Sequence, residues 1–187
     1  MLIRTCSILD SFFKRALFSP KLDKATDIKM YRAYDDKNIN MGTHRVVFDP
    51  FYQLSSKKIY ELRTFEPITP FSNWSSNKKL DWWEAYNHVK HDRFKNQKEA
   101  TFQSTLNALG GLFILNVIHL ETMPVLVDYD IIKSYLAKGT IKSVLEMKEP
   151  LKRLDTVYAK TKLFGYVFDS GYEPDYEHIL SRSYPGY

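Results

Sequence analysis

Cysteine is nearly absent from this sequence, which has a single one, Cys6, among its 187 residues. One thiol cannot form a disulfide within the chain, and it cannot build a cysteine-based zinc site. Nothing in the sequence therefore requires an oxidising compartment. We expect Cys6 to be buried and to pack as a small hydrophobic side chain.

Long apolar runs are also missing. The most apolar stretch, Ala108–Leu120, includes Asn116 and His119 and falls well short of the roughly 20 residues that cross a bilayer. The N-terminal stretch is interrupted by Arg4 and Asp10 and lacks the apolar run of a signal peptide. We expect a soluble, cytoplasmic protein with no membrane partner.

Several catalytic signatures are absent as well. The sequence has no glycine-rich phosphate loop, no nucleophile elbow with a Ser-His-Asp order and no His-Glu-x-x-His zinc motif. His88 and His91 lie three residues apart, but the carboxylates beside them do not complete a zinc site. The sequence therefore predicts no metal and no cofactor.

A modest excess of positive charge is present. Lys and Arg number 27 against 22 Asp and Glu, so the net charge is +5 and the pI is near 9.1. This balance favours polyanionic partners without requiring them. The length and the 44% apolar composition allow one sizeable core and predict a single domain.

Hydrophobic periodicity predicts a mainly α protein. Apolar residues recur at helical spacing through residues 2–18, and a shorter helix is predicted at 24–34. Strand-like residues, including Arg45 to Phe48, and three prolines predict a small extended or β-hairpin insertion around 45–70, within the segment 43–76. A long helix is then predicted to run through Arg93.

A further helix is predicted from about Gln97 to Glu121. Asn96 and Glu99 have the spacing of a capping box that would start it. Gly110-Gly111 lowers its helix propensity by roughly 1 kcal/mol per glycine, which indicates either a closely crossing helix or local flexibility. The helix is apolar nearly all round after Ala108, as at the centre of a bundle. Its main stripe comprises Phe102, Leu106, Leu109, Phe113, Val117 and Leu120.

The C-terminal third carries weaker signals. Residues 128–138 have a helical pattern that ends at Gly139. Residues 155–168 are rich in aromatic and β-branched side chains and predict either a strand pair or an irregular flap. We interpret 1–124 as the helical domain, and 125–187 as a helix plus an irregular or strand-like extension packed on that same domain.

The segment Trp82–Arg93 concentrates aromatic, basic and imidazole groups. On a helix, Asn87, Lys90 and His91 share one face, and Tyr86 and Arg93 belong to the adjoining stripe. Together these groups can bind a phosphate backbone, and an imidazole can transfer protons near neutral pH. The alternative is a solvated helix face whose charges keep the chain soluble.

Three segments together carry a resemblance to a known family. The stretches Cys6–Lys14, Trp82–Arg93 and Leu106–Phe113 resemble bacterial proteins of the HEPN superfamily, in particular abortive-infection-like members, over roughly residues 1–120. The resemblance implies an up-and-down helical bundle and a homodimer. It also implies metal-independent RNA cleavage in toxin-antitoxin or phage-defence systems, where an antitoxin or another protein partner is expected.

The chain departs from that family at its central motif. Active members carry an Arg followed four to six residues later by a His, and no Arg of this sequence has such a His. The substitute offered here is His91 as a general base with Arg93 binding the phosphate. Lys90, Asn87, Tyr86 and Lys95 are the predicted nucleic-acid contacts.

Two alternatives stay open. The segment can bind RNA without cleaving it, or the chain can be a noncatalytic helical module that docks to another protein. The tryptophans Trp82 and Trp83 could stack on bases, but packing in the core is the favoured interpretation.

Overall fold

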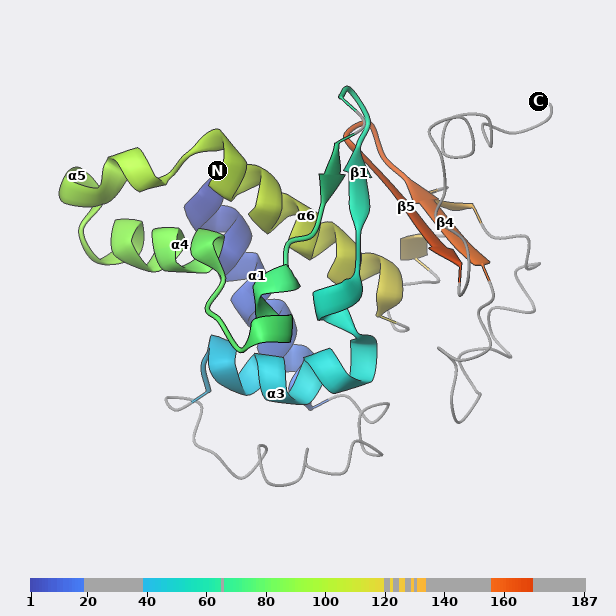
Figure 1. Ribbon diagram of the computed structural model, residues 1–187, viewed down its shortest axis with the longest axis horizontal. Helices are drawn as coiled ribbons and strands as arrows, with labels where there is room; N and C mark the ends of the chain where they lie inside the picture. Colours follow the sequence, from blue (N-terminus) through green and yellow to red (C-terminus); the bar gives the residue numbers. More distant parts are fainter. Residues whose placement is uncertain are drawn as a thin grey trace. The chain divides into compact units, whose positions relative to one another are not determined.

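The computed structural model describes residues 1–18, 39–64, 66–119, 122, 125–126, 129, 131–133 and 156–169. These residues are mainly helical, which confirms the predicted class at that level (Figure 1). The helix expected at 24–34 and nearly all of the C-terminal tail lie outside the described residues. The chain divides into two compact units, one formed by Met1–Lys57 and Thr69–Leu112, the other by Lys58–Ile68 and the chain from Phe113 onward.

The first unit is helical. It contains α1 (Leu2–Leu17), α3 (Met41–Tyr52), the 3-10 turns η3 (Leu54–Ser56) and η4 (Ser72–Ser76), α4 (Asp81–His91), α5 (Arg93–Asn96), η5 (Gln97–Glu99) and the first part of α6 (Phe102–Ile118).

Helix α1 confirms the periodicity of its sequence. It spans Leu2–Leu17 and buries Leu9, Phe13 and Leu17. Cys6 is fully buried, and burial raises the pKa of its thiol to about 12. A thiol with that pKa stays protonated at neutral pH, so Cys6 packs as the small hydrophobic side chain that was predicted.

Helix α3 corrects the prediction of a strand at Arg45–Phe48. Asn40 starts the helix, because its Oδ1 accepts hydrogen bonds from the backbone N–H groups of Gly42 and Thr43, at 2.9 and 3.2 Å. The Thr43 side chain completes the capping box by accepting from the Asn40 N–H. Val47 and Phe48 are buried on the inner face of this helix, so tertiary packing overrides their strand propensity.

An aromatic cluster forms the core of the first unit. The Phe13 ring lies 5.0 Å from that of Phe48 and 6.3 Å from that of Phe71, measured between centroids. Phe71 in turn lies 4.9 Å from Trp74 and 5.9 Å from Trp82. The core thus joins α1, α3, η4 and α4, and the predicted packing role of the α4 tryptophans is confirmed.

The helix expected to run through Arg93 ends earlier. α4 stops at His91, and Asp92 has an extended backbone (φ −146°, ψ 90°). The Asp92 carboxylate then accepts a hydrogen bond from the Lys95 N–H at 3.1 Å and caps the short helix α5. Asp favours such a cap over a helix interior, so Arg93 does not continue the α4 stripe that carries Tyr86.

The start of α6 is also later than predicted. Thr101 caps the helix by accepting a hydrogen bond from the Ser104 N–H at 3.0 Å, and the capping box expected from Asn96 and Glu99 does not form. The chain bends by 81° between Arg93–Glu99 and Phe102–Ile118. Phe102, assigned to the buried stripe, is 78% exposed. No helix among the described residues has by itself the length and apolar content of a membrane span.

Gly111 explains one close approach to α6. A Cβ atom at this position would lie 3.1 Å from the Phe71 ring and 3.6 Å from Pro70. The absent side chain therefore admits an aromatic ring from the segment before η4, where the sequence had indicated a crossing helix or flexibility.

The second unit contains an antiparallel sheet with strand order β2-β1-β5-β4-β3. Its strands are β1 (Ile59–Glu61), β2 (Pro67–Ile68), β3 (Ile132–Lys133), β4 (Thr156–Lys160) and β5 (Phe164–Asp169). Of the alternatives that the sequence left open, β1 and β2 form the hairpin within 45–70, and β4 and β5 form the strand pair at 155–168.

One helix prediction fails in the second unit. Ile132 and Lys133 pair with β4 in an antiparallel register, inside the segment 128–138 that was predicted to be helical. The cross-strand partners Ala159 and Tyr158 supply backbone hydrogen bonds that a local pattern cannot reveal.

Candidate nucleic-acid interface

Helix α4 changes character along its length. Its first turns bury Trp82, Trp83, Tyr86 and Val89. From Lys90 onward, every residue to Lys98 is exposed except Asn96, which is half-buried. We call this segment, residues 90–98, the basic tip.

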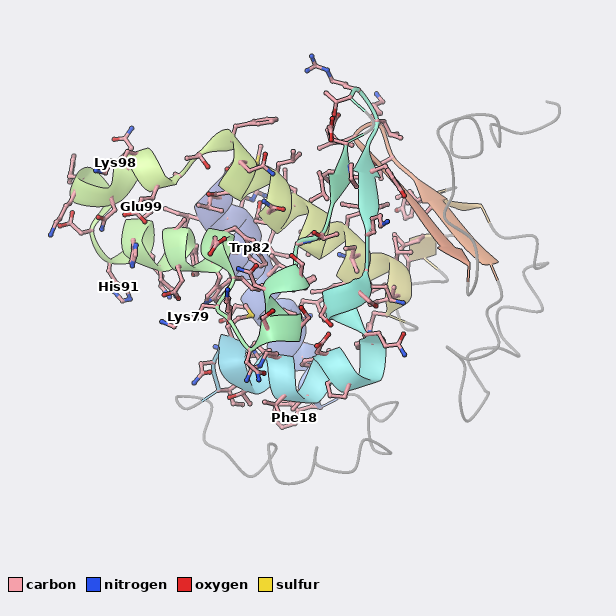
Figure 2. All side chains as sticks on the ribbon, in the orientation of Figure 1. Phe18, Lys79, Trp82, His91, Lys98 and Glu99 are labelled. Carbon is pink, nitrogen blue, oxygen red and sulfur yellow. The ribbon has the colours of Figure 1, made fainter. Side chains whose placement is uncertain are left out.

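The basic tip is rich in cations around one aromatic ring. Phe94 is 97% exposed and stands among these groups on α5. Figure 2 places His91 and Lys98 at the same end of the first unit, with the His91 side chain directed outward. The exposed cationic and imidazole side chains of the tip are Lys90, His91, Arg93, Lys95 and Lys98.

Both carboxylates near the tip are engaged within the chain. Asp92 caps α5. Glu99, just beyond the tip, has its Oε2 atom 2.6 Å from Nδ1 of His88. Farther back on α4, Glu84 forms an ion pair with Lys79 at 2.9 Å.

His88 holds the tip against α4. Besides the contact with Glu99, its backbone carbonyl accepts hydrogen bonds from the Asp92 N–H at 3.0 Å and from the Asn96 side-chain amide at 2.9 Å. The segment therefore folds back along α4 in a defined geometry, with its cations exposed, the Asp92 carboxylate bonded to the Lys95 N–H and the Glu99 carboxylate facing His88.

The predicted site residues fall into two groups. His91, Arg93, Lys90 and Lys95 are all exposed on the tip. Tyr86 is 4% exposed, and Lys90 Nζ lies 5.4 Å from the centre of its ring. Tyr86 thus supports the tip from beneath by packing and by a cation-π contact.

Asn87 belongs to a pocket that sequence reasoning missed. The pocket has a volume of about 390 Å³, and its walls come from the start of α3, the loop between η4 and α4, and α4 itself. Among the side chains that line it are Arg45, Trp74, Lys78, Lys79, Trp83 and Asn87.

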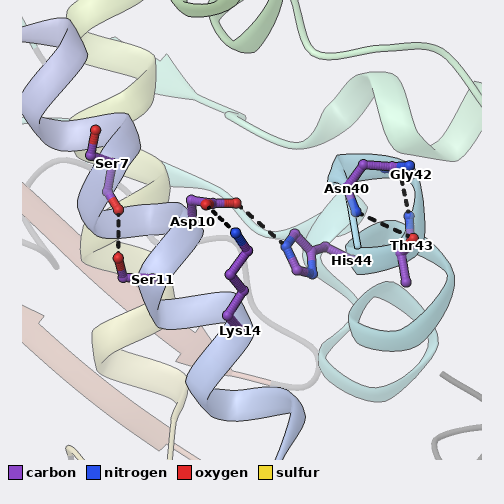
Figure 3. A network of polar contacts seen from close by, with 8 residues as sticks. All are labelled: Ser7, Asp10, Ser11, Lys14, Asn40, Gly42, Thr43 and His44. Carbon is purple, nitrogen blue, oxygen red and sulfur yellow. Dashed lines mark hydrogen bonds and ion pairs between the residues drawn. The ribbon is translucent and has the colours of Figure 1, made fainter. Parts of the chain in front are cut away.

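A second polar feature that the sequence did not reveal lies between α1 and α3 (Figure 3). His44 is fully buried and stacks on Phe13 at 4.7 Å. Its Nε2 atom lies 3.8 Å from Oδ1 of Asp10, whose other oxygen is 2.9 Å from Lys14 Nζ. Because the imidazole is enclosed, the contact is structural.

Burial dominates the electrostatics of this pair. It lowers the pKa of His44 below that of an exposed imidazole, and Asp10 opposes the shift. The nearby His44, followed by Lys14, lowers the pKa of Asp10. Neither nitrogen of His44 has a hydrogen-bond partner among the described residues, so the neutral ring is the form that this site accepts.

No group of three or more His, Cys, Asp or Glu side chains in the described part of the chain is placed to hold a metal ion. Comparison of the chain with protein-family models, curated proteins and solved structures finds no match.

Proposed function

We propose that this chain binds single-stranded RNA through the basic tip. The observation that carries the proposal is the outward set of cations around Phe94, in a segment whose carboxylates are engaged internally. Such a surface has an attractive potential for a polyanion even though the whole chain has a net charge of only +5.

The chemistry of a single strand matches these groups. Lysine and arginine contact phosphates and release counterions from the strand. An exposed aromatic ring can stack on a base of any identity, which contributes about 1–3 kcal/mol per base. Phe94, at 97% exposure, has its faces open to such stacking.

The other sequence-based expectations remain predictions. They are the HEPN-like up-and-down bundle, the homodimer and the bacterial stress or phage-defence setting. Cleavage is predicted to use His91 as the base and Arg93 as the phosphate ligand; both are exposed on the tip, so both can reach a bound strand.

Fluorescence anisotropy with a labelled mixed-sequence 12-nucleotide RNA tests the proposal. The tip variant carries Lys90→Ala, Arg93→Ala and Lys95→Ala. The matched control carries Arg4→Ala, Arg15→Ala and Lys162→Ala, which removes three exposed positive charges from α1 and from the turn between β4 and β5. Thermal melts of both variants check that folding is retained.

We expect the tip variant to lose at least about tenfold in affinity and the control to lose much less. The slope of log K against log salt should fall by about 2 in the tip variant, because each phosphate contact on a single strand contributes about 0.7. Equal losses in the two variants would mean that net charge alone attracts RNA and would overturn the proposal. Gel analysis of the same samples, with His91→Ala and Arg93→Ala added, tests cleavage.

A further inference from the structure

The pocket beside α4 has the composition of a ligand site. Its volume of about 390 Å³ lies within the range of small-molecule pockets. The residues that line it come from three parts of the sequence, 40–45, 74–80 and 83–87, and all belong to the first unit. None of the described contacts of the basic tip uses this volume.

The charges that line the pocket favour an anion. Lys79 and Glu84 both line the pocket and offset each other as an ion pair at 2.9 Å. Arg45 and Lys78 also line the pocket, and neither forms an ion pair with the described residues. The side chains of Arg45 and Lys78 therefore remain available to one ligand. Both can form charge-assisted hydrogen bonds with a phosphate group.

The indole rings add donors and flat apolar surface. Trp74 and Trp83 are 3% and 9% exposed, and neither ring nitrogen donates a hydrogen bond to the described residues. By contrast, Trp82 donates to the Pro70 carbonyl at 2.7 Å. Both tryptophans line the pocket, and neither indole nitrogen is among the fully enclosed polar atoms without a partner in the described part of the chain, which are those of His44.

The loop that forms one wall is held in place before any ligand binds. The Asn77 N–H donates to the Trp74 carbonyl at 3.1 Å, and the Lys78 N–H to the Asn73 carbonyl at 2.9 Å. The Asn73 side chain donates to the Lys79 carbonyl at 2.8 Å. Asn77 adopts a left-handed backbone (φ 57°) that Asn tolerates well. A pre-ordered wall reduces the entropic cost of binding.

We propose that this pocket binds one nucleotide unit. Arg45 and Lys78 hold the phosphate, the indole surfaces contact the base, and Asn87 and the free indole N–H groups bond the polar edge of the base or sugar. The unit is a free nucleoside monophosphate or one residue of an RNA strand.

The strand form rests on the proposed function, since Glu84, Asn87 and His91 share one face of α4. That face leads from the pocket to the basic tip. A strand whose phosphates contact the tip can therefore place a neighbouring nucleotide in the pocket.

The indole N–H signals of the full chain test the proposal in proton–nitrogen NMR spectra. The chain has three tryptophans, and Trp74→Phe and Trp83→Phe variants assign their signals. The ligands added are AMP, UMP, ribose 5-phosphate and inorganic phosphate, each up to 10 mM. We expect AMP and UMP to shift the Trp74 and Trp83 signals, while the Trp82 signal, already hydrogen-bonded, stays in place.

Point variants locate the anion. Lys78→Ala should weaken AMP binding about tenfold, the effect of removing one charge-assisted hydrogen bond. Lys162→Ala, which removes an exposed lysine from the turn between β4 and β5, should leave it unchanged. Equal shifts with inorganic phosphate, or with ribose 5-phosphate, would overturn the assignment of a base, and no shift of either signal would overturn the site.

The two proposals fail separately. If the tip variant loses RNA but retains AMP, and Lys78→Ala weakens both ligands, the pocket takes a residue of the strand. If Lys78→Ala weakens AMP alone, the source is the free nucleotide. RNA binding by the tip with no AMP binding would remove the pocket and leave the proposed function standing.

Discussion

The two ends of α4 lie a few turns apart and show opposite relations to solvent. At the first end, Trp82 and Trp83 are enclosed in an aromatic core. Just past the second, on α5, Phe94 is almost completely exposed among cations. Between residues 82 and 94, an aromatic side chain is therefore enclosed in the core when it precedes the break at Asp92 and exposed to solvent when it follows it.

Replacing one aromatic ring by alanine in the enclosed core, and one on the exposed tip, should give the largest difference between the two regions. Phe71→Ala should destabilise the first unit by roughly 3–5 kcal/mol, because it opens a cavity beside Phe13, Trp74 and Trp82. Phe94→Ala should change stability by no more than about 0.5 kcal/mol. Urea unfolding followed by tryptophan fluorescence reports on this unit, since all three tryptophans lie in it.

A smaller truncation of Phe71 serves as a control for the alanine variant. Phe71→Leu should cost less than Phe71→Ala because it leaves a smaller cavity. If Phe94→Ala proved as damaging as Phe71→Ala, the tip would be part of the core and the contrast between the two ends would be wrong.

Lowering the pH should destabilise the packed region, because the imidazole of His44 is buried there. Burial lowers the pKa of His44, so below pH 6.5 the unfolded chain binds this proton more readily than the folded chain. The stability linked to His44 is therefore complete above about pH 6.5 and falls as the pH drops below it, by at most about 1.4 kcal/mol per pH unit. Asp10, whose pKa is lowered mainly by the nearby His44, adds a loss only at pH values below the usual pKa range of an aspartate.

His44→Phe should remove the loss between pH 6.5 and 5, because an apolar ring replaces the imidazole stacked on Phe13. Asp10→Asn should keep that loss, since the carboxylate opposes the shift of the His44 pKa. Urea titrations at several pH values measure both. A His44→Phe variant with the same pH dependence as the original chain would refute the assignment to His44.

The smallest expected change in stability comes from removing the contact between Glu99 and His88, which holds the basic tip against α4. Glu99→Gln removes the charge that faces His88 at 2.6 Å, in a pair that is partly exposed. Global stability should fall by only a few tenths of a kcal/mol, while amide hydrogen exchange of residues 93–99 should accelerate. Glu84→Gln breaks the pair with Lys79 instead and should leave exchange in the tip unchanged.

Local patterns predicted those elements whose signals are strong by themselves. The apolar period of α1 predicted its helix without tertiary information. The aromatic and β-branched residues of β4 and β5 narrowed that region to a strand pair or an irregular flap. Helix capping shows where a local sequence pattern is not enough to predict a helix start. Asn40 and Thr43 form a capping box, whereas Asn96 and Glu99, at the same spacing, bond His88 instead.

The candidate sites were predictable only in part. The basic tip could be found from sequence, because its cations all lie between residues 90 and 98 and need only exposure to act. The pocket could not be found, because Arg45, Lys78 and Asn87 come together only when three separate segments pack. His44 was overlooked for a related reason: its neighbours 45–48 look like a strand, and its contact with Asp10 depends on the packing of α3 against α1.

Hydrogen exchange of the full chain, measured with and without a 12-nucleotide RNA, tests the division of α4 most directly. We expect RNA to slow hydrogen exchange in peptides that cover residues 90–98. The exchange rates of the already protected amides in the aromatic core should not change. Protection confined to other segments, with the exchange of residues 90–98 unaltered at saturating RNA, would contradict it.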